Sequence, residues 1–198
     1  MDYTDIFAIA ICYLLGCINT GYYYVRLVHK QDIRSIGTKV TGAYNVSRLS
    51  GKKGFIITFI GDALKGAFAV LLCRYLSDSE TVLMLGILMV LAGHIFPFQL
   101  RFRGGKGLSA AFGAFMTFNP QIIFLWLAAS IVLFPLIRKY TVTVLFALMF
   151  LPLELFIFDF SYKVILFFIL YAAVIIFACR SNMQEFIKDR AYHGKKYD

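Results

Sequence analysis

The stretch GFIITFIGDALKGAFAVLLCRYL, residues 54–76, decides the fold class of this chain. About 20 apolar residues cross the hydrocarbon core of a bilayer, so a run of this length is typical of a transmembrane helix. Asp62 and Lys65 lie inside the run, three positions apart and therefore on one helix face. Charges within a membrane normally pair with each other or line a site. We expect these two to support a polar site, with simple mutual neutralisation as the plainer alternative.

The composition extends this interpretation to the whole chain of 198 residues. Hydrophobic residues make up 60%, with a mean hydropathy of +0.75, whereas soluble proteins contain roughly 45 to 50%. The net charge of +9 would suit a nucleic-acid binder, but the 21 Phe residues and the hydropathy exclude that class. The four cysteines lie singly in apolar runs, without the spacing of a disulfide framework or a metal site. We expect no metal, no cofactor and no nucleic-acid partner.

Seven apolar runs predict an all-α membrane protein, a compact bundle of seven transmembrane helices in one domain over residues 1–198. The expected spans are residues 6–24, 54–76, 82–100, 104–118, 122–137, 142–158 and 164–178. The fourth span is short, since its 15 residues reach roughly 22 Å at about 1.5 Å per residue.

The distribution of charge indicates that the fourth run also crosses. With seven spans and the N-terminus outside, 17 of the 20 Lys and Arg residues fall on the inner side. If the fourth run stayed on one side, Arg138, Lys139 and the basic tail would move outside, against the positive-inside rule. We therefore expect an outer N-terminus and a cytoplasmic C-terminus. The inner segment 25–53 is then too long for a plain connection, which indicates a functional role.

The first candidate site is the stretch DIRSIGTKVTGAYNVSR, which ends at Arg48. Gly37 and Gly42 allow backbone conformations that turn N–H groups toward an anion. Thr38, Asn45 and Arg48 add hydroxyl, amide and cationic donors, a set that suits phosphate. The plainer interpretation is a cytoplasmic loop beside anionic lipid headgroups.

The second candidate site is the stretch GHIFPFQLRFRGGKG, which ends at Gly107. A Gly-Gly-Lys-Gly turn at the start of a helix presents backbone donors, the positive end of the helix dipole and a cation to one anion. The turn consists of Gly104, Gly105, Lys106 and Gly107. The spacing of a nucleotide-binding P-loop is absent. We expect His94 to brace the turn, although a packing or capping histidine is the plainer interpretation.

These residues resemble the motifs of the bacterial integral-membrane acyl-phosphate:glycerol-3-phosphate acyltransferases. The first motif of that family, Ser-x-Gly-Ser-Gly-Asn-x-Gly-x-Thr-Asn-x-x-Arg, maps onto residues 35–48, with Thr38 in place of its second Ser. The second motif, Gly-His-x-Phe-Pro-x4-Phe-x-Gly-Gly-Lys-Gly, is complete from residue 93 to residue 107. Asp62 and Lys65, followed by a glycine, also match the family's second helix. The resemblance is strong over this half of the chain.

The third motif of the family, His-Arg-x-Asn-Ile-x-Arg followed by a Glu, matches only in part. Arg180 and Asn182 agree with it, whereas Cys179 stands in place of the His. Glu185 stands in place of the last Arg, and Ala191 lies at about the position of the Glu. The resemblance is therefore thin in the C-terminal part.

The resemblance implies transfer of a fatty acyl group from acyl phosphate to the 1-hydroxyl of glycerol 3-phosphate, which gives lysophosphatidic acid and phosphate. It also implies a multi-pass protein of the bacterial cytoplasmic membrane whose active site faces the cytoplasm. The catalytic residues implied are Thr38, Arg48, Lys106 and Asn182. The residues implied to bind substrate phosphate are Gly37, Gly42, Asn45, Gly104, Gly105 and Gly107. Supporting residues are His94, Asp62, Lys65 and Arg180.

Two alternatives stay open at this point. A divergent paralogue would keep the phosphate-binding segments but lack this activity or use another acceptor. A small transporter would place Asp62, Lys65 and Glu154 along a path through the membrane, although the chain shows no repeated halves. Neither the acyl-chain preference nor the oligomeric state follows from the sequence.

Overall fold

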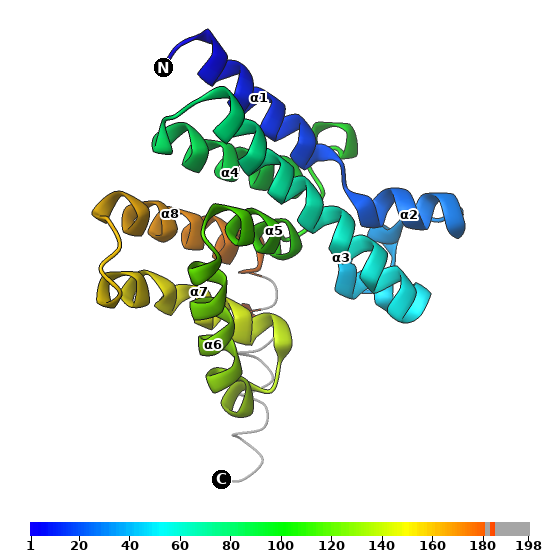
Figure 1. Cartoon of the computed structure of the whole chain (residues 1–198). Coiled ribbons are helices and arrows are strands. Elements are labelled where there is room, and N and C mark those ends of the chain that lie inside the picture. The colour runs from blue at the N-terminus through cyan, green and yellow to red at the C-terminus, as the bar shows by residue number, and fades with distance from the viewer. Residues whose placement is uncertain (181–182, 185–198) are drawn as a thin grey trace. The chain divides into compact units, whose positions relative to one another are not determined.

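The computed structural model describes residues 1–180 and 183–184 and shows a helical chain without strands in those residues (Figure 1). Residues 1–120 form one compact unit, and the described residues from 121 onward belong to a second. The two units are described separately. The predicted all-α class is confirmed for the described residues, while a single bundle of seven spans stays a prediction.

The helices of the N-terminal unit are α1 (Tyr3–Cys17), α2 (Thr20–Val28), η1 (Ile33–Ser35), α3 (Ala43–Leu76), α4 (Glu80–Ile95), η2 (Phe98–Leu100) and α5 (Leu108–Phe118). The remaining helices are α6 (Pro120–Ile137), α7 (Tyr140–Ile157) and α8 (Tyr162–Ala178). Within the described residues, five segments are long and apolar enough to cross a membrane, namely Tyr3–Val28, Ala43–Leu76, Glu80–Leu100, Pro120–Ile137 and Tyr140–Ile157. Two shorter apolar helices, α5 with 11 residues and α8 with 17, complete the set.

The predicted span over residues 6–24 lies within the apolar segment Tyr3–Val28, but it is not one continuous helix, because the chain leaves the helical conformation at Ile18 and Asn19. Helix α2 then continues to Val28. Much of the predicted inner segment 25–53 is helical, since α3 begins at Ala43 and is kinked at Gly51, where φ is 60°. Only residues 29–42 connect α2 to α3. Hydropathy does not predict the first part of α3 as a helix, because this part contains many polar residues.

The fourth predicted span is corrected as well, because α5 begins at Leu108 and not at Gly104. Gly104 and Gly105 donate their N–H groups to carbonyls at the end of α4, each at 3.0 Å, so they cannot continue a helix. Gly107 has a φ of 82°, which marks the turn into α5. At about 1.5 Å per residue, α5 is about 16 Å long, shorter than the hydrocarbon core.

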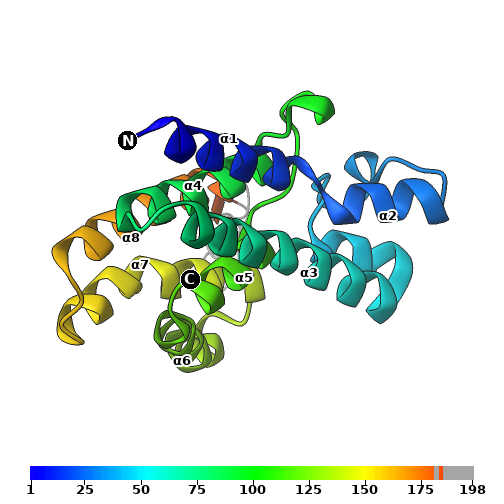
Figure 2. The same cartoon turned by 45° about the horizontal axis from the view of Figure 1, so that its top comes forward.

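Glycine allows the helices of the N-terminal unit to pack with their backbones in contact. A Cβ atom on Gly66 of α3 would collide with the carbonyl of Ala110 in α5, and one on Gly113 of α5 would collide with the carbonyl of Ala63. Helices α1 and α4 lie side by side in the same manner at Gly16 (Figures 1 and 2). Small residues at helix contacts are typical of membrane proteins, where close van der Waals packing drives association.

In the second unit, α7 and α8 pack against each other as a hairpin (Figure 1). Their fully buried side chains include Leu148 from α7 and Phe168 from α8. The indole Nε1 of Trp126 in α6 donates to the carbonyl of Val144 in α7 at 2.9 Å. This bond satisfies the polar end of a buried aromatic side chain and links α6 to the hairpin.

The helix contact at Gly66 yields the first prediction. In Gly66→Ala, the new methyl group meets the α5 backbone, so we expect the free energy of unfolding to fall by about 1–3 kcal/mol. The matched control is Gly42→Ala, because no atom lies within 4 Å of a Cβ built there and its φ of −74° suits any residue. Thermal unfolding of the purified variants in detergent measures the difference. Equal midpoints for the two variants would contradict the packing argument.

Candidate phosphate-binding site

Arg34 connects the segment between α2 and α3 to the loop that follows α4. Its guanidinium binds both carboxylate oxygens of Asp32 at 2.7–3.1 Å, and its Nη1 donates to the carbonyl of Leu100 at 2.7 Å. The hydrogen bonds from Arg34 lower the pKa of the Asp32 carboxyl, and the same pairing raises the pKa of Arg34. Both groups are therefore charged near neutral pH, and the connection does not depend on pH in that range.

Thr41 makes a second connection between the same two segments. Its backbone N–H donates to the carbonyl of Gly104 at 3.4 Å, and its hydroxyl donates to Oδ1 of Asn19 at 2.5 Å. The glycine-rich stretches that the sequence presents separately are thus hydrogen-bonded to each other. The motifs do not predict this connection, because Arg34 and Thr41 are not among the predicted site residues. In the sequence, Asn19 is distinguished only as a polar residue at the end of an apolar run.

Asn45 holds the segment between α2 and α3 in shape. Its Oδ1 accepts from the N–H of Thr38 at 2.9 Å. Its Nδ2 donates at 2.9–3.2 Å to the carbonyls of Ile33, Ile36 and Val40. Gly37 has a φ of 54°, and a Cβ there would collide with the Asn45 amide. The loop backbone therefore occupies both ends of the amide, and contact between Asn45 and a substrate phosphate stays a prediction.

Arg48 lies one turn along α3 from Asn45 and is exposed. Its guanidinium lies over the ring of Tyr44, 5.2 Å from the centroid, and its side chain passes beside Gly37. No carboxylate forms an ion pair with it in the part of the chain that the structure describes. Thr38, whose N–H is held by Asn45, is half-buried nearby in the loop. The charge of Arg48 is therefore presented to the surroundings beside a rigid loop.

The Gly104–Gly107 turn leads directly into the N-terminus of α5. The first N–H groups of a helix have no acceptor within it, and the helix dipole makes this end positive. Lys106 is half-buried within the turn. His94 is buried against it, since a Cβ on Gly105 would collide with the imidazole Nε2. The position of His94 agrees with a bracing role, which stays a prediction.

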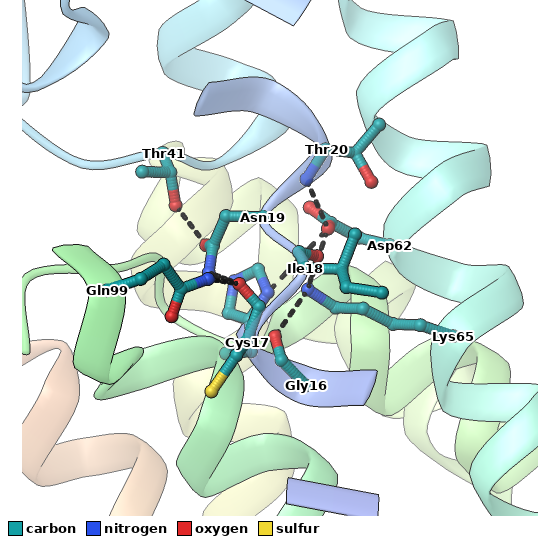
Figure 3. A network of polar contacts seen from close by, with 10 residues as sticks. Gly16, Cys17, Ile18, Asn19, Thr20, Thr41, Asp62, Lys65 and Gln99 are labelled. Atoms are coloured by element: carbon teal, nitrogen blue, oxygen red, sulfur yellow. Dashed lines mark hydrogen bonds and ion pairs between the residues drawn. The ribbon is translucent and has the colours of Figure 1, made fainter. Parts of the chain in front are cut away.

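Asp62 and Lys65 form a buried ion pair, with 3.0 Å between Oδ1 and Nζ (Figure 3). The same carboxylate oxygen lies 3.7 Å from Nδ1 of His94, which is beyond hydrogen-bond distance. The pair contacts the break between α1 and α2, where Thr20 donates its N–H to Asp62 at 3.3 Å. The two charges therefore pair with each other, as the plainer interpretation predicts, and their support of the candidate site stays a prediction.

The third-motif residues belong to the second unit. Arg180 donates to the carbonyl of Phe177 at 3.2 Å and lies over its ring, and Cys179 is buried. Asn182 and Glu185 lie outside the described residues. Among the described residues, no three His, Cys, Asp or Glu side chains form a group that could hold a metal ion.

Comparison with known proteins gives a family match over most of the chain. The family model described as glycerol-3-phosphate acyltransferase matches residues 6–189. Glycerol-3-phosphate acyltransferase 1 of Desulfitobacterium hafniense (strain Y51) is 41% identical over 149 residues, which cover 75% of this chain and 74% of that protein. The protein of the same name from Bacillus cereus (strain ATCC 14579) is 38% identical, over 75% of this chain and 82% of its own.

The structural comparison gives a solved membrane enzyme with the same fold. The crystal structure of PlsY (YgiH), an integral membrane glycerol 3-phosphate acyltransferase, in its glycerol 3-phosphate form superposes with a TM-score of 0.85. It is 28% identical and covers 94% of this chain and 93% of its own. The lysophosphatidic acid form of that enzyme gives a TM-score of 0.82. The prediction of a multi-pass integral membrane protein is confirmed by this likeness.

The amide of Asn45 yields the second prediction. In Asn45→Asp, an oxygen replaces the donor that faces three carbonyl groups, so we expect the free energy of unfolding to fall by about 3 kcal/mol or more. Hydrogen exchange of the amides in residues 33–41 should accelerate at the same time. Ser47→Ala is the control, because the Ser47 hydroxyl donates only to the nearby carbonyl of Tyr44. Unchanged exchange in Asn45→Asp would show that the amide does not hold this loop.

Proposed function

This chain belongs to the glycerol-3-phosphate acyltransferase family, and from that premise we propose that it acylates the 1-hydroxyl of glycerol 3-phosphate with acyl phosphate as the donor. The reaction forms an ester bond between the glycerol oxygen and the acyl carbon. It breaks the bond between the acyl carbon and the phosphate oxygen. The products are lysophosphatidic acid and inorganic phosphate, so the enzyme acts in phospholipid biosynthesis.

The observation that carries the proposal is the connection between two anion-binding segments. One segment presents Arg48 beside the loop at Gly37, and the other presents Lys106 and the N-terminus of α5. The bonds from Arg34 and Thr41 join the two. A reaction between two phosphate-bearing substrates needs two anion sites at a fixed separation, and orientation of this kind supplies a large part of many rate enhancements. We assign one substrate phosphate to Arg48 and Thr38 and the other to the Gly104–Gly107 turn.

The chemistry requires little covalent help from the protein. Acyl phosphate carries a good leaving group, and backbone N–H groups with nearby cations stabilise charge on the carbonyl oxygen and on the departing phosphate. We propose that the departing phosphate accepts the proton of the attacking hydroxyl. This route does not use an imidazole at position 179, and it is compatible with the buried Cys179 found there. In the same scheme, Asn182 orients the substrates and Arg180 supports it.

We also propose that the candidate site faces the cytoplasm in a bacterial cytoplasmic membrane, with seven spans and an outer N-terminus. The strong excess of basic residues in alternate connections supports this orientation. In this topology the segment between α2 and α3 and the Gly104–Gly107 turn lie on the same side. The short α5 is then the fourth span, packed closely against α3 where small residues bring the two backbones together.

The activity prediction concerns the two cations. With purified protein, acyl phosphate and glycerol 3-phosphate, we expect phosphate release and lysophosphatidic acid formation by the unaltered chain. Arg48→Ala and Lys106→Ala each remove charge stabilisation, and turnover should fall by about 100-fold or more. Lys163→Ala is the control, because this exposed lysine lies at the start of α8, outside the candidate site.

Three outcomes would contradict the proposal. Phosphate release no greater than from heat-killed protein would exclude the enzyme and favour a paralogue that only binds lipid phosphates. Full activity in both alanine variants would keep the enzyme but exclude these two anion sites. Liposomes that show solute flux without product formation would favour the transporter alternative.

The topology prediction uses introduced cysteines, because the four native cysteines are buried and should give little background labelling. Asp78→Cys places a thiol in the exposed connection between α3 and α4, and Gln31→Cys places one between α2 and α3. A membrane-impermeant maleimide should label the first variant in intact spheroplasts and the second only after permeabilisation. The unaltered chain serves as the control for background labelling. The opposite pattern would reverse the proposed orientation.

A further inference from the structure

Lys65 is a buried cation whose three N–H groups all have acceptors. Its Nζ lies 3.0 Å from Oδ1 of Asp62, 3.0 Å from the carbonyl of Gly16 and 2.6 Å from the carbonyl of Ile18 (Figure 3). The side chains of Lys65 and Asp62 are only 5% and 1% exposed. A buried ion pair contributes little net stability compared with well-packed apolar side chains of the same volume. The contacts that the pair makes therefore indicate a role other than general stability.

The pair satisfies backbone groups that the break between α1 and α2 leaves without helical partners. In an unbroken helix, the carbonyl of Gly16 would accept from the N–H of Thr20. Here Lys65 donates to that carbonyl, and Asp62 accepts from the Thr20 N–H at 3.3 Å. One carboxylate and one ammonium thus replace both halves of a missing helical hydrogen bond. Without them, unpaired backbone groups within an apolar bundle would favour a different path of the chain.

Lys65 donates to the carbonyls of Gly16 and Ile18, and the carbonyl of Cys17 between them accepts a hydrogen bond from the loop that follows α4. Nε2 of Gln99 donates to the carbonyl of Cys17 at 2.5 Å, and Nδ2 of Asn19 donates to the same oxygen at 3.2 Å. The carbonyls of residues 16–18 therefore all accept from side chains. Figure 3 shows that these donors converge on the short non-helical piece between α1 and α2.

The break is also linked by contacts to both candidate anion-binding segments. Asn19, which lies in the break, accepts from the Thr41 hydroxyl at 2.5 Å, and the Thr41 N–H donates to the carbonyl of Gly104. A Cβ on Gly21, at the start of α2, would collide with the carbonyl of Thr41. The path from Lys65 to the Gly104–Gly107 turn therefore runs through direct hydrogen bonds and one close backbone contact.

We propose that Lys65 and Asp62 are positioning residues for the acyl transfer, acting through Asn19 and Thr41 on the separation of the two phosphate sites. This inference rests on the proposed function. Neither residue touches the substrates in this scheme. Loss of the pair releases the break, and the loop at Thr41 then no longer holds the two anion sites at one distance. The effect falls on the binding of both substrates, because each phosphate site includes one of the linked segments, and on the rate of transfer between them, because that rate depends on their separation.

The experiment compares three variants with the unaltered chain. Asp62→Asn/Lys65→Met removes both charges together, so that no unpaired charge remains buried, and Lys65→Met alone shows the effect of leaving Asp62 unpaired. Thr58→Val is the matched control, because Thr58 is buried one turn before Asp62 on α3 and the change is nearly isosteric. Thermal unfolding establishes that each variant is folded.

In the folded double variant, we expect the KM values for glycerol 3-phosphate and acyl phosphate to rise together by about tenfold or more. The value of kcat should also fall by about tenfold or more, because the two bound substrates are no longer held at one separation. Thr58→Val should retain both parameters. Unchanged kcat and KM values in the folded double variant would overturn the positioning role.

Hydrogen exchange tests the inference without reference to activity. Amides in residues 33–42 and 98–105 should exchange faster in the double variant than in the unaltered chain or in Thr58→Val. Equal exchange in all three would overturn the inference even if the enzyme is active. If the unaltered chain shows no turnover but the double variant shows faster exchange, the proposed reaction fails and the structural coupling stands.

Discussion

The structure depends on one constraint, which is that backbone polar groups inside a membrane must find partners within the protein. Most of the chain meets this constraint by forming helices. The break between α1 and α2 meets it with side chains, since Lys65, Asp62 and Gln99 take the places of helical partners. The Gly104–Gly107 turn meets it by donating to the carbonyls at the end of α4. The irregular segments exist because polar residues from distant parts of the chain satisfy them.

This constraint explains which helices hydropathy predicts and which it does not. The run 54–76 lies within α3, and the runs 122–137 and 142–158 coincide closely with α6 and α7, because a long apolar stretch has few alternatives to a helix. Hydropathy does not predict the break at residues 18–19, because glycines such as the flanking Gly16 and Gly21 are also frequent within unbroken membrane helices. The helical start of α3 at Ala43 is hidden for the opposite reason, because many of its residues are polar and its apolar face is narrow, with Val46 packed in a small buried cluster with Val25 and Ile33.

For the candidate site too, the sequence predicts some features and not others. Gly37, Arg48 and the Gly104–Gly107 turn stand out in the sequence because glycine and cations at close spacing are typical of anion sites. Their connection does not stand out, since it consists of a guanidinium on a carbonyl and a threonine N–H on a glycine carbonyl. Such bonds need only a donor near a backbone oxygen. Almost any polar residue can supply that donor, so the sequence does not show which residue does. Asn45 shows the converse, because its residue type suggested a ligand contact and its amide is bonded to the loop.

The proposed chemistry also bears on the altered third motif. An enzyme that must generate its own leaving group depends on a well-placed acid or base, and replacement of that residue removes most of its activity. An acyl phosphate arrives with its leaving group already activated, and that group becomes a competent proton acceptor as it departs. Catalysis then depends mainly on where the two anions are held, a task for backbone N–H groups and cations. By this reasoning, the residues that fix the distance between the phosphate sites matter more to this chain than the identity of the side chain at position 179.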